Sequence, residues 1–349
     1  MSTTEQTATP RTQAQSVTFA NALNRALADA MASDESVIMF GEDVGTLGGV
    51  FRITDGLTAR FGESRCFDTP LAESGIVGMA IGMAMNGMRP VVEMQFDAFA
   101  YPAFQQIMSH VAKMSNRTKG AVRLPMVIRV PYAGGIGGVE HHCDSSEAYY
   151  AHTPGLTVIT PSTVEDSYTM LRDAIASDDP VIFMEPKKLY FSKEQVDLDQ
   201  LAQSWDLRED AKSTIGTARI AKEGTDVTLV AYGPSVAPAL QAARIAEEEG
   251  RSVEVIDARS LTPFDDKTLE ESVRKTGRAV VISEAAGFAS VASEIVARIQ
   301  ERCFHSLAAP VLRVTGFDVP YPAPKLEHFY LPNAVRILDA IDDLQWEDA

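Results

Sequence analysis

Residues 68 to 90 read DTPLAESGIVGMAIGMAMNGMRP, a mostly apolar run with regularly placed glycines. Gly75, Gly78 and Gly82 are spaced three and four residues apart, so in a helix they lie on one face. Each glycine costs a helix about 1 kcal/mol relative to alanine, so a close contact must compensate. This close contact is either packing against another helix of the chain or a subunit interface beside a ligand. Glu73 opens this helix, where an acid favours the helix dipole or takes a catalytic role.

Short apolar runs alternate with helix-sized segments on both sides of this stretch. Residues 17 to 35 carry apolar side chains at helical spacing, with Thr18 as a candidate N-cap. Uninterrupted apolar runs without polar alternation are typical of a parallel sheet that is covered on both faces. The predicted strands are VIMF (37–40), PVVEMQF (90–96), MVIRV (126–130), LTVIT (156–160) and VIFME (181–185).

A second alternation of strands and helices begins after residue 212. It predicts a smaller α/β unit, built from strands at 226–233, 252–260, 279–285 and 309–317 and helices near 235–250, 265–277 and 290–303. We therefore expect a disordered leader at 1–15, a first α/β domain at 16–190, a charged linker at 191–212 and a second α/β domain at 213–349.

The composition excludes several classes of protein. The formal net charge of -17 repels phosphate backbones and anionic membranes, so nucleic acid is not expected as a partner. No apolar run is long enough to cross a bilayer. The cysteines Cys66, Cys143 and Cys303 are odd in number and far apart, which predicts free thiols in a reducing cytoplasm.

The glycine-rich loop AGGIGGVE (133–140) follows a predicted strand, as a dinucleotide-binding loop would. The pattern fails, because Glu140 stands where the third glycine belongs when the motif begins at Gly135 and Gly137. A Walker A sequence is also missing. The loop therefore does not predict a nucleotide site.

Two histidines and a cysteine follow this loop in EHHCD (140–144). Zinc binding by His141, His142 and Cys143 is disfavoured, because consecutive side chains cannot easily turn toward one ion. A Cys143 nucleophile with His142 as its base meets a similar difficulty, though less decisively. A satisfied or solvated histidine and an acid/base histidine both remain open.

Six motifs in order resemble the beta subunit of the E1 component of 2-oxoacid dehydrogenase complexes. The resemblance runs from about Val17 to the C-terminus and implies a thiamin-diphosphate pyrimidine-binding domain with a parallel sheet, followed by a smaller transketolase C-terminal-like domain. The motifs are GEDVG (41–45), GGVFRITDGL (48–57), DTPLAESGIVGMAIGMAMNG (68–87), EMQFDAFAYPAFQQI (93–107), EHHCDSSEAYYAH (140–152) and EPKKLY (185–190).

The resemblance also implies roles for individual residues. Glu73 matches the glutamate that hydrogen-bonds the pyrimidine of thiamin diphosphate and promotes its activation. Phe99 matches the ring that packs on the pyrimidine, Gln95 a polar residue near the substrate, and Glu42 an acid between the two cofactors of the tetramer. His142 matches the family histidine, and His141 is then a bystander. Family members usually have the sequence HSQ at this point, whereas this chain has HCD (142–144). The change places the acidic side chain of Asp144 two residues after His142.

The family further implies partners and ions. Two alpha and two beta chains form a heterotetramer in which the alpha chain holds Mg²⁺, and the acyl group passes to a lipoyl-bearing E2. This chain lacks a GDG segment, as expected if another chain holds the diphosphate.

Branched-chain 2-oxo acids are the first expectation for substrate, and pyruvate the second. Two other functions compete with this one: a scaffold subunit without catalytic activity, and a thiol hydrolase that uses Cys143. Potassium ligation by main-chain carbonyls is implied at Met126, Ala174, Ile175, Ser177 and Asp179.

Overall fold

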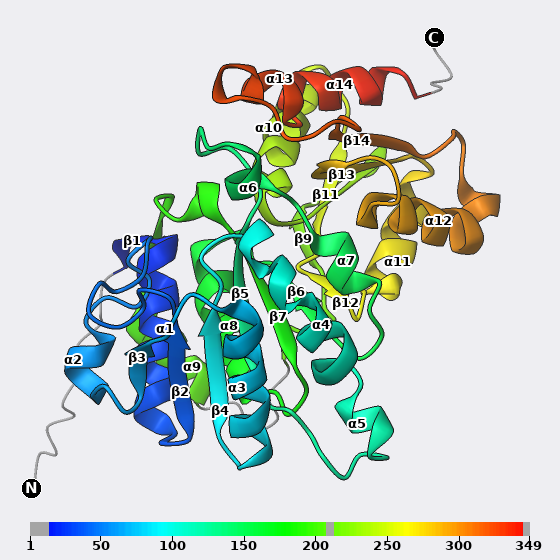
Figure 1. The fold of residues 1–349 in the computed structure, drawn as a ribbon. Coiled ribbons are helices and arrows are strands. Elements are labelled where there is room, and N and C mark those ends of the chain that lie inside the picture. The colour runs from blue at the N-terminus through cyan, green and yellow to red at the C-terminus, as the bar shows by residue number, and fades with distance from the viewer. Residues whose placement is uncertain (1–13, 207–212, 345–349) are drawn as a thin grey trace, which may run out of the picture.

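A computed structural model describes residues 14–206 and 213–344 of the chain. Figure 1 shows two sheets, each with helices packed on both sides. The first sheet has seven strands, and all of its neighbours pair in parallel except the edge pair β12 and β6. Its order is β12 (Ser260–Thr262), β6 (Thr157–Ile159), β7 (Val181–Pro186), β5 (Val127–Tyr132), β4 (Arg89–Glu93), β2 (Val37–Gly41) and β3 (Cys66–Asp68). The five strands predicted for this domain are therefore confirmed.

Both faces of this sheet are buried, which explains the uninterrupted apolar runs. In β2, Val37 and Met39 join the core beneath helices α1 (Phe19–Ser33) and α8 (Val164–Ala176). Ile38 and Phe40 point to the opposite face and join the core beneath α3 (Glu73–Met85). Because side chains alternate between faces, a strand covered on both sides needs apolar residues at every position.

The predicted start of α1 is confirmed. The Thr18 side chain accepts a hydrogen bond from the Asn21 amide at 3.1 Å, which satisfies one of the free amide groups of the first turn. Thr163 caps α8 in the same way, accepting from the Asp166 amide at 3.1 Å.

The second sheet has five strands in the order β14 (Leu312–Gly316), β13 (Ala279–Ala286), β10 (Val227–Ala231), β11 (Val253–Asp257) and β9 (Arg219–Lys222). Only β9 runs antiparallel within it. Helices α10 (Val236–Glu248) and α14 (Ala334–Asp342) bury one face. Helices α11 (Asp266–Thr276) and α12 (Val291–Cys303) bury the other face, in a core that continues into the first domain. The two α/β units are thus joined by shared apolar packing.

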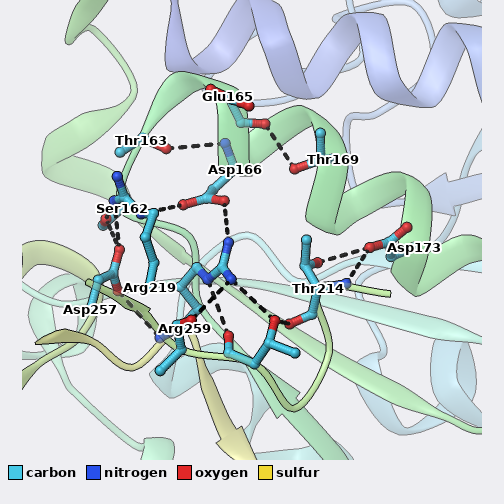
Figure 2. Close-up of polar contacts among 12 residues, drawn as sticks. Ser162, Thr163, Glu165, Asp166, Thr169, Asp173, Thr214, Arg219, Asp257 and Arg259 are labelled. Carbon is cyan, nitrogen blue, oxygen red and sulfur yellow. Dashed lines mark hydrogen bonds and ion pairs between the residues drawn. The ribbon is translucent and has the colours of Figure 1, made fainter. Parts of the chain in front are cut away.

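A polar seam accompanies this shared core (Figure 2). Arg259 donates to Asp166 of α8 at 3.0 Å, and Arg219 of β9 donates to Asp257 at 2.9 Å. Ser162, which precedes α8, also donates to Asp257. Charges buried between domains need partners of opposite sign, and these pairs provide them.

The segment expected to link the domains, 191–212, carries regular structure in its described part. Strand β8 (Lys193–Val196) pairs antiparallel with β1 (Gln15–Thr18), and α9 (Leu198–Asp206) contacts α1 and α8. These elements are short and largely surface-lying, which is why the sequence showed no sustained period there. Of the expected leader, residues 1–13 lie outside the described residues, and Gln15 already belongs to β1.

The remaining helices are short: α2 (Leu57–Phe61), α4 (Phe104–Gln106), α5 (Met114–Arg117), α6 (Glu140–Cys143), α7 (Glu147–Ala151) and α13 (Glu327–Tyr330). Helices α6 and α7 lie between the two sheets in Figure 1. No described helix is both long and apolar enough to cross a membrane.

Candidate active site

The candidate site lies at the carboxyl edge of the seven-stranded sheet. Strands β2, β4, β5 and β7 are parallel neighbours, so the residues that follow them meet at one edge. Glu42 follows β2, Gln95 and Phe96 follow β4, the glycine-rich loop follows β5, and Lys187 follows β7. Residues from four separate motifs are therefore gathered by the topology.

Two carboxyl groups lie close enough at this edge for the charge of one, Glu73, to act on the other, Glu42. Glu42 is 6% exposed, and its Oε1 has no hydrogen-bond partner among the described residues. Burial, followed by the charges of Glu73 and Asp43, raises the pKa of Glu42 to about 7. Glu73 is half-buried in the first turn of α3. With its pKa raised to about 7, the Glu42 carboxyl is largely protonated below neutral pH and can then donate a hydrogen bond.

Gln95 and Phe99 lie in the segment that follows β4. The Gln95 Nε2 donates to Asp43 Oδ2 at 2.8 Å, so its carbonyl oxygen remains available. The Phe99 ring packs edge-on to Phe96, with centroids 5.5 Å apart. Both rings are only partly buried and can offer a surface to a planar ligand.

The structure separates the two adjacent histidines. His142 packs against Phe96 and Phe99, with ring centroids 4.5 Å and 5.5 Å apart, whereas His141 is exposed. The Asp144 carboxylate accepts a hydrogen bond from the Tyr101 hydroxyl at 2.9 Å. His142, not His141, therefore belongs to the cluster that contains Phe99.

Cys143 is not placed to act as a nucleophile. It is 1% exposed and lies in a small apolar cluster with Tyr321, Tyr330 and Leu331. Burial raises the pKa of the Cys143 thiol to about 11, although the charge of Lys187 opposes this. A thiol with such a pKa is almost entirely protonated at neutral pH, which counts against the thiol hydrolase.

A buried lysine beneath the site was missed by the sequence reasoning. Lys187 is 1% exposed, and its Nζ has no hydrogen-bond partner among the described residues. Burial lowers its pKa to about 8, with the charge of Asp97 opposing most strongly. Asp97 accepts a hydrogen bond from the Ser146 amide at 2.9 Å, and burial raises its pKa to about 7. The sequence signal that could have revealed Lys187 is its position as a charged residue directly after strand β7.

A fully buried ion-pair network supports the same edge. Arg129 of β5 lies between two acids, with Nη1 at 2.5 Å from Glu93 Oε2 and Nε at 2.7 Å from Glu185 Oε1. The Tyr190 hydroxyl donates to Glu185 Oε2 at 2.7 Å. These bonds join the ends of β4, β5 and β7, which fixes the platform from which the site residues project.

The carbonyl groups implied for potassium are already engaged within the chain. Arg89 Nη1 donates to the Ile175 and Ser177 carbonyls at 3.2 Å and 2.8 Å, and Arg89 Nη2 donates to Asp178 Oδ1 at 2.7 Å. The other three also accept: Met126 from the Val181 amide at 3.0 Å, Ala174 from the Ser177 amide at 3.3 Å, and Asp179 from Ser177 Oγ at 3.1 Å. Each carbonyl keeps a second lone pair. A guanidinium beside them nevertheless disfavours a further cation. Within residues 14–206 and 213–344, no group of three or more His, Cys, Asp or Glu could hold a metal ion.

Comparison with known proteins shows the family of the chain. Residues 15–193 match the transketolase pyrimidine binding domain, and residues 216–337 match the transketolase C-terminal domain. The chain is 53% identical over 335 residues to the pyruvate dehydrogenase E1 component subunit beta of Leifsonia xyli, and the match covers 96% of each chain. The chain belongs to the E1 beta family of 2-oxoacid dehydrogenases.

Other E1 beta relatives carry a different substrate name. The 3-methyl-2-oxobutanoate dehydrogenase subunit beta of Mycobacterium tuberculosis is 50% identical over 329 residues, covering 94% of this chain and 92% of the relative. A solved structure titled as a split gene transketolase, inactive beta4 tetramer, superposes with a TM-score of 0.75 and 24% identity, over 94% of this chain and 98% of that one. That structure supports the fold alone.

Proposed function

We propose that this E1 beta chain takes part in the oxidative decarboxylation of a 2-oxo acid and in acyl transfer to the lipoyl group of an E2 acyltransferase. The observation that carries the proposal is that Glu42, Glu73, Phe99 and His142 lie in segments that follow four neighbouring parallel strands of one sheet. Each residue comes from a different motif, and together they offer a proton-carrying carboxylate pair, a stacking ring and an imidazole.

The residues fit thiamin diphosphate as the cofactor, because an aminopyrimidine needs a carboxylate partner and an apolar surface. We infer that the Glu73 carboxyl donates its proton to a ring nitrogen of the pyrimidine and takes it back, while Phe99 packs on the ring. Glu42 holds a second proton beside Glu73, and Gln95 faces the substrate side. The cofactor, when bound, supplies the electron sink for loss of carbon dioxide.

The partner is inferred to be an E1 alpha chain in a heterotetramer of two alpha and two beta chains. Helix α3 presents Gly75 and Gly82 on its exposed side, and the neighbouring Leu71 and Met79 are 79% and 38% exposed. A glycine face that its own chain leaves open gains compensation from a second backbone. In this proposal the alpha chain holds Mg²⁺ and the diphosphate, and the complex works in the cytoplasm.

His142 is proposed to donate a proton when the lipoyl dithiolane opens. Its ring lies against Phe96 and Phe99 at the site, and the neighbouring Asp144 hydrogen-bonds with Tyr101. The imidazole is thus held against two aromatic rings, and we infer that it exchanges a proton there.

Branched-chain 2-oxo acids remain our proposed substrates, with pyruvate as the second candidate. The relatives named for the two activities are 50% and 53% identical, so overall identity does not choose between them. Turnover of the purified alpha and beta chains on a panel of 2-oxo acids, with a lipoyl domain as acceptor, tests the proposal. A complex that turns over none of them but still binds E2 would indicate the rival scaffold subunit.

Potassium binding at Met126, Ala174, Ile175, Ser177 and Asp179 is kept as a secondary proposal. Its test compares thermal unfolding in potassium chloride and in tetramethylammonium chloride at equal ionic strength. Bound potassium should raise the unfolding temperature only in the potassium salt. Equal temperatures would indicate that Arg89 alone provides the positive charge at these carbonyls.

A further inference from the structure

The glycine-rich loop that leads to His142 is held by the C-terminal domain. Glu327, in the first turn of α13, accepts hydrogen bonds from two loop amides, Gly135 at 2.7 Å and Gly137 at 3.3 Å. Glu284, near the end of β13, accepts from the Gly134 amide at 3.1 Å. Two acids of one domain therefore bind three amides of the other domain's loop, those of Gly134, Gly135 and Gly137.

Tyr321 reinforces this attachment. Its hydroxyl donates to Glu327 Oε1 at 2.6 Å, and the Gly135 amide approaches the same hydroxyl at 3.3 Å. A Cβ at Gly134 would overlap the Tyr321 ring, so the glycine permits this approach. On the far side of the loop, Cys143 packs against Tyr321, Tyr330 and Leu331. Both ends of the segment from 134 to 143 thus rest on the same part of the C-terminal domain.

The tip of the loop is rich in glycine and partly exposed. Gly135 and Gly137 adopt left-handed backbone angles, with φ of +83° and +68°. Ile136 and Val139 are 39% and 47% exposed, so apolar burial does not fix the turn. Glycines in a turn carry a large conformational entropy in the absence of specific bonds. The carboxylate of Glu327 is the group that joins the two left-handed residues.

We propose that Glu327 is a positioning residue, which holds the 134–138 loop so that His142 faces the site against Phe96 and Phe99. The proposal rests on the proposed role of His142 in acyl transfer. Glu327 touches neither substrate nor cofactor in this proposal; it acts through the loop backbone. The C-terminal domain would then control the reaction with the lipoyl group while leaving the decarboxylation step largely intact.

The test uses the complete chain assembled with its alpha subunit. Glu327→Ala should increase hydrogen exchange of the 134–143 amides by about tenfold or more, because charge-assisted hydrogen bonds to them are lost. Acyl transfer to a lipoyl domain should slow by a similar factor, whereas reduction of an artificial electron acceptor should change little. Glu327→Gln keeps one acceptor oxygen and should restore most of the transfer rate. Tyr321→Phe keeps the ring and should give a smaller defect, which provides a second variant if Glu327→Ala folds poorly.

Three comparisons decide the outcome. Glu301→Ala, at an exposed acid of α12, is the matched control and should leave both the exchange and the transfer unchanged. The double variant Glu327→Ala with His142→Ala should transfer acyl groups no more slowly than His142→Ala alone. Additive losses in the double variant would overturn the inference. Unchanged hydrogen exchange of the loop amides in Glu327→Ala would overturn it as well. If His142→Ala leaves transfer at the wild-type rate, the proposed function of His142 fails, whatever happens to the loop.

Discussion

The imidazole of His142 lies edge-on to the Phe96 ring, with centroids 4.5 Å apart, while its neighbour His141 is exposed. This relationship makes the two histidines separable by experiment. His142→Ala should slow acyl transfer to the lipoyl domain by about 10²- to 10⁴-fold, the usual value of general acid/base help. Decarboxylation with an artificial acceptor should suffer less, and His141→Ala should cost little in either assay. Equal losses from both substitutions would assign the chemistry to a different group.

Glu73→Gln should leave the fold intact but slow cofactor activation severely, because an amide cannot hold and return the proton. The measurement is deuterium exchange of the thiazolium C2 proton in the assembled tetramer. Glu63→Gln, at an exposed acid before β3, is the control. An exchange rate like that of wild type would remove Glu73 from its proposed role.

Cys143→Ser should retain activity while lowering stability. A hydroxyl placed in the apolar cluster of Tyr321, Tyr330 and Leu331 costs about 1–3 kcal/mol unless it finds a hydrogen-bond partner. Chemical denaturation of the purified chain gives the stability, and turnover in the assembled enzyme gives the activity. Loss of turnover without loss of stability would revive the thiol nucleophile.

Gly82→Leu should weaken assembly with the alpha chain without destabilising the chain itself. A Cβ at Gly82 meets no described atom beyond its own helix backbone within 4 Å, so we expect a larger side chain to clash with a partner rather than with this chain. Gly78 is a poorer site for this test, because a Cβ there would lie 4.0 Å from Gln106. Sedimentation velocity of the mixed chains reports assembly, and thermal unfolding of the variant alone is the control. A tetramer of unchanged affinity would place the seam elsewhere.

The pH dependence of stability should carry a contribution from Glu42. Its pKa is raised from 4.5 to about 7, so between these values the unfolded chain ionises Glu42 while the folded chain keeps it protonated. This contribution therefore disfavours folding increasingly as pH rises through the window and levels off above about pH 7. Glu42→Gln should gain thermal stability over wild type progressively from pH 5.5 to 8. A gain that does not vary with pH would contradict the raised pKa.

Much of the fold could be predicted because its signals are local. The uninterrupted run VIMF predicted a strand buried on two faces, and Val37 and Ile38 do point into two different cores. Thr18 was recognisable as a helix cap from its position before an amphipathic segment. Strand β12 was not predicted, because three residues from the second half of the chain complete an edge of the first sheet by non-local pairing.

The candidate site likewise combines features that the sequence predicts with features that depend on the tertiary structure. The sequence by itself determined which residue types are present, and the order of its motifs pointed to Glu73, Phe99 and His142. Only the tertiary structure decided that the Lys187 Nζ is buried without a hydrogen-bond partner among the described residues, that Arg89 lies at the Ile175 and Ser177 carbonyls, and that Glu327 binds the glycine-rich loop. Burial and long-range hydrogen bonds depend on which segments the folded chain brings together. Gly135 and Glu327 are 192 residues apart in the sequence, and no local pattern in either segment records their contact.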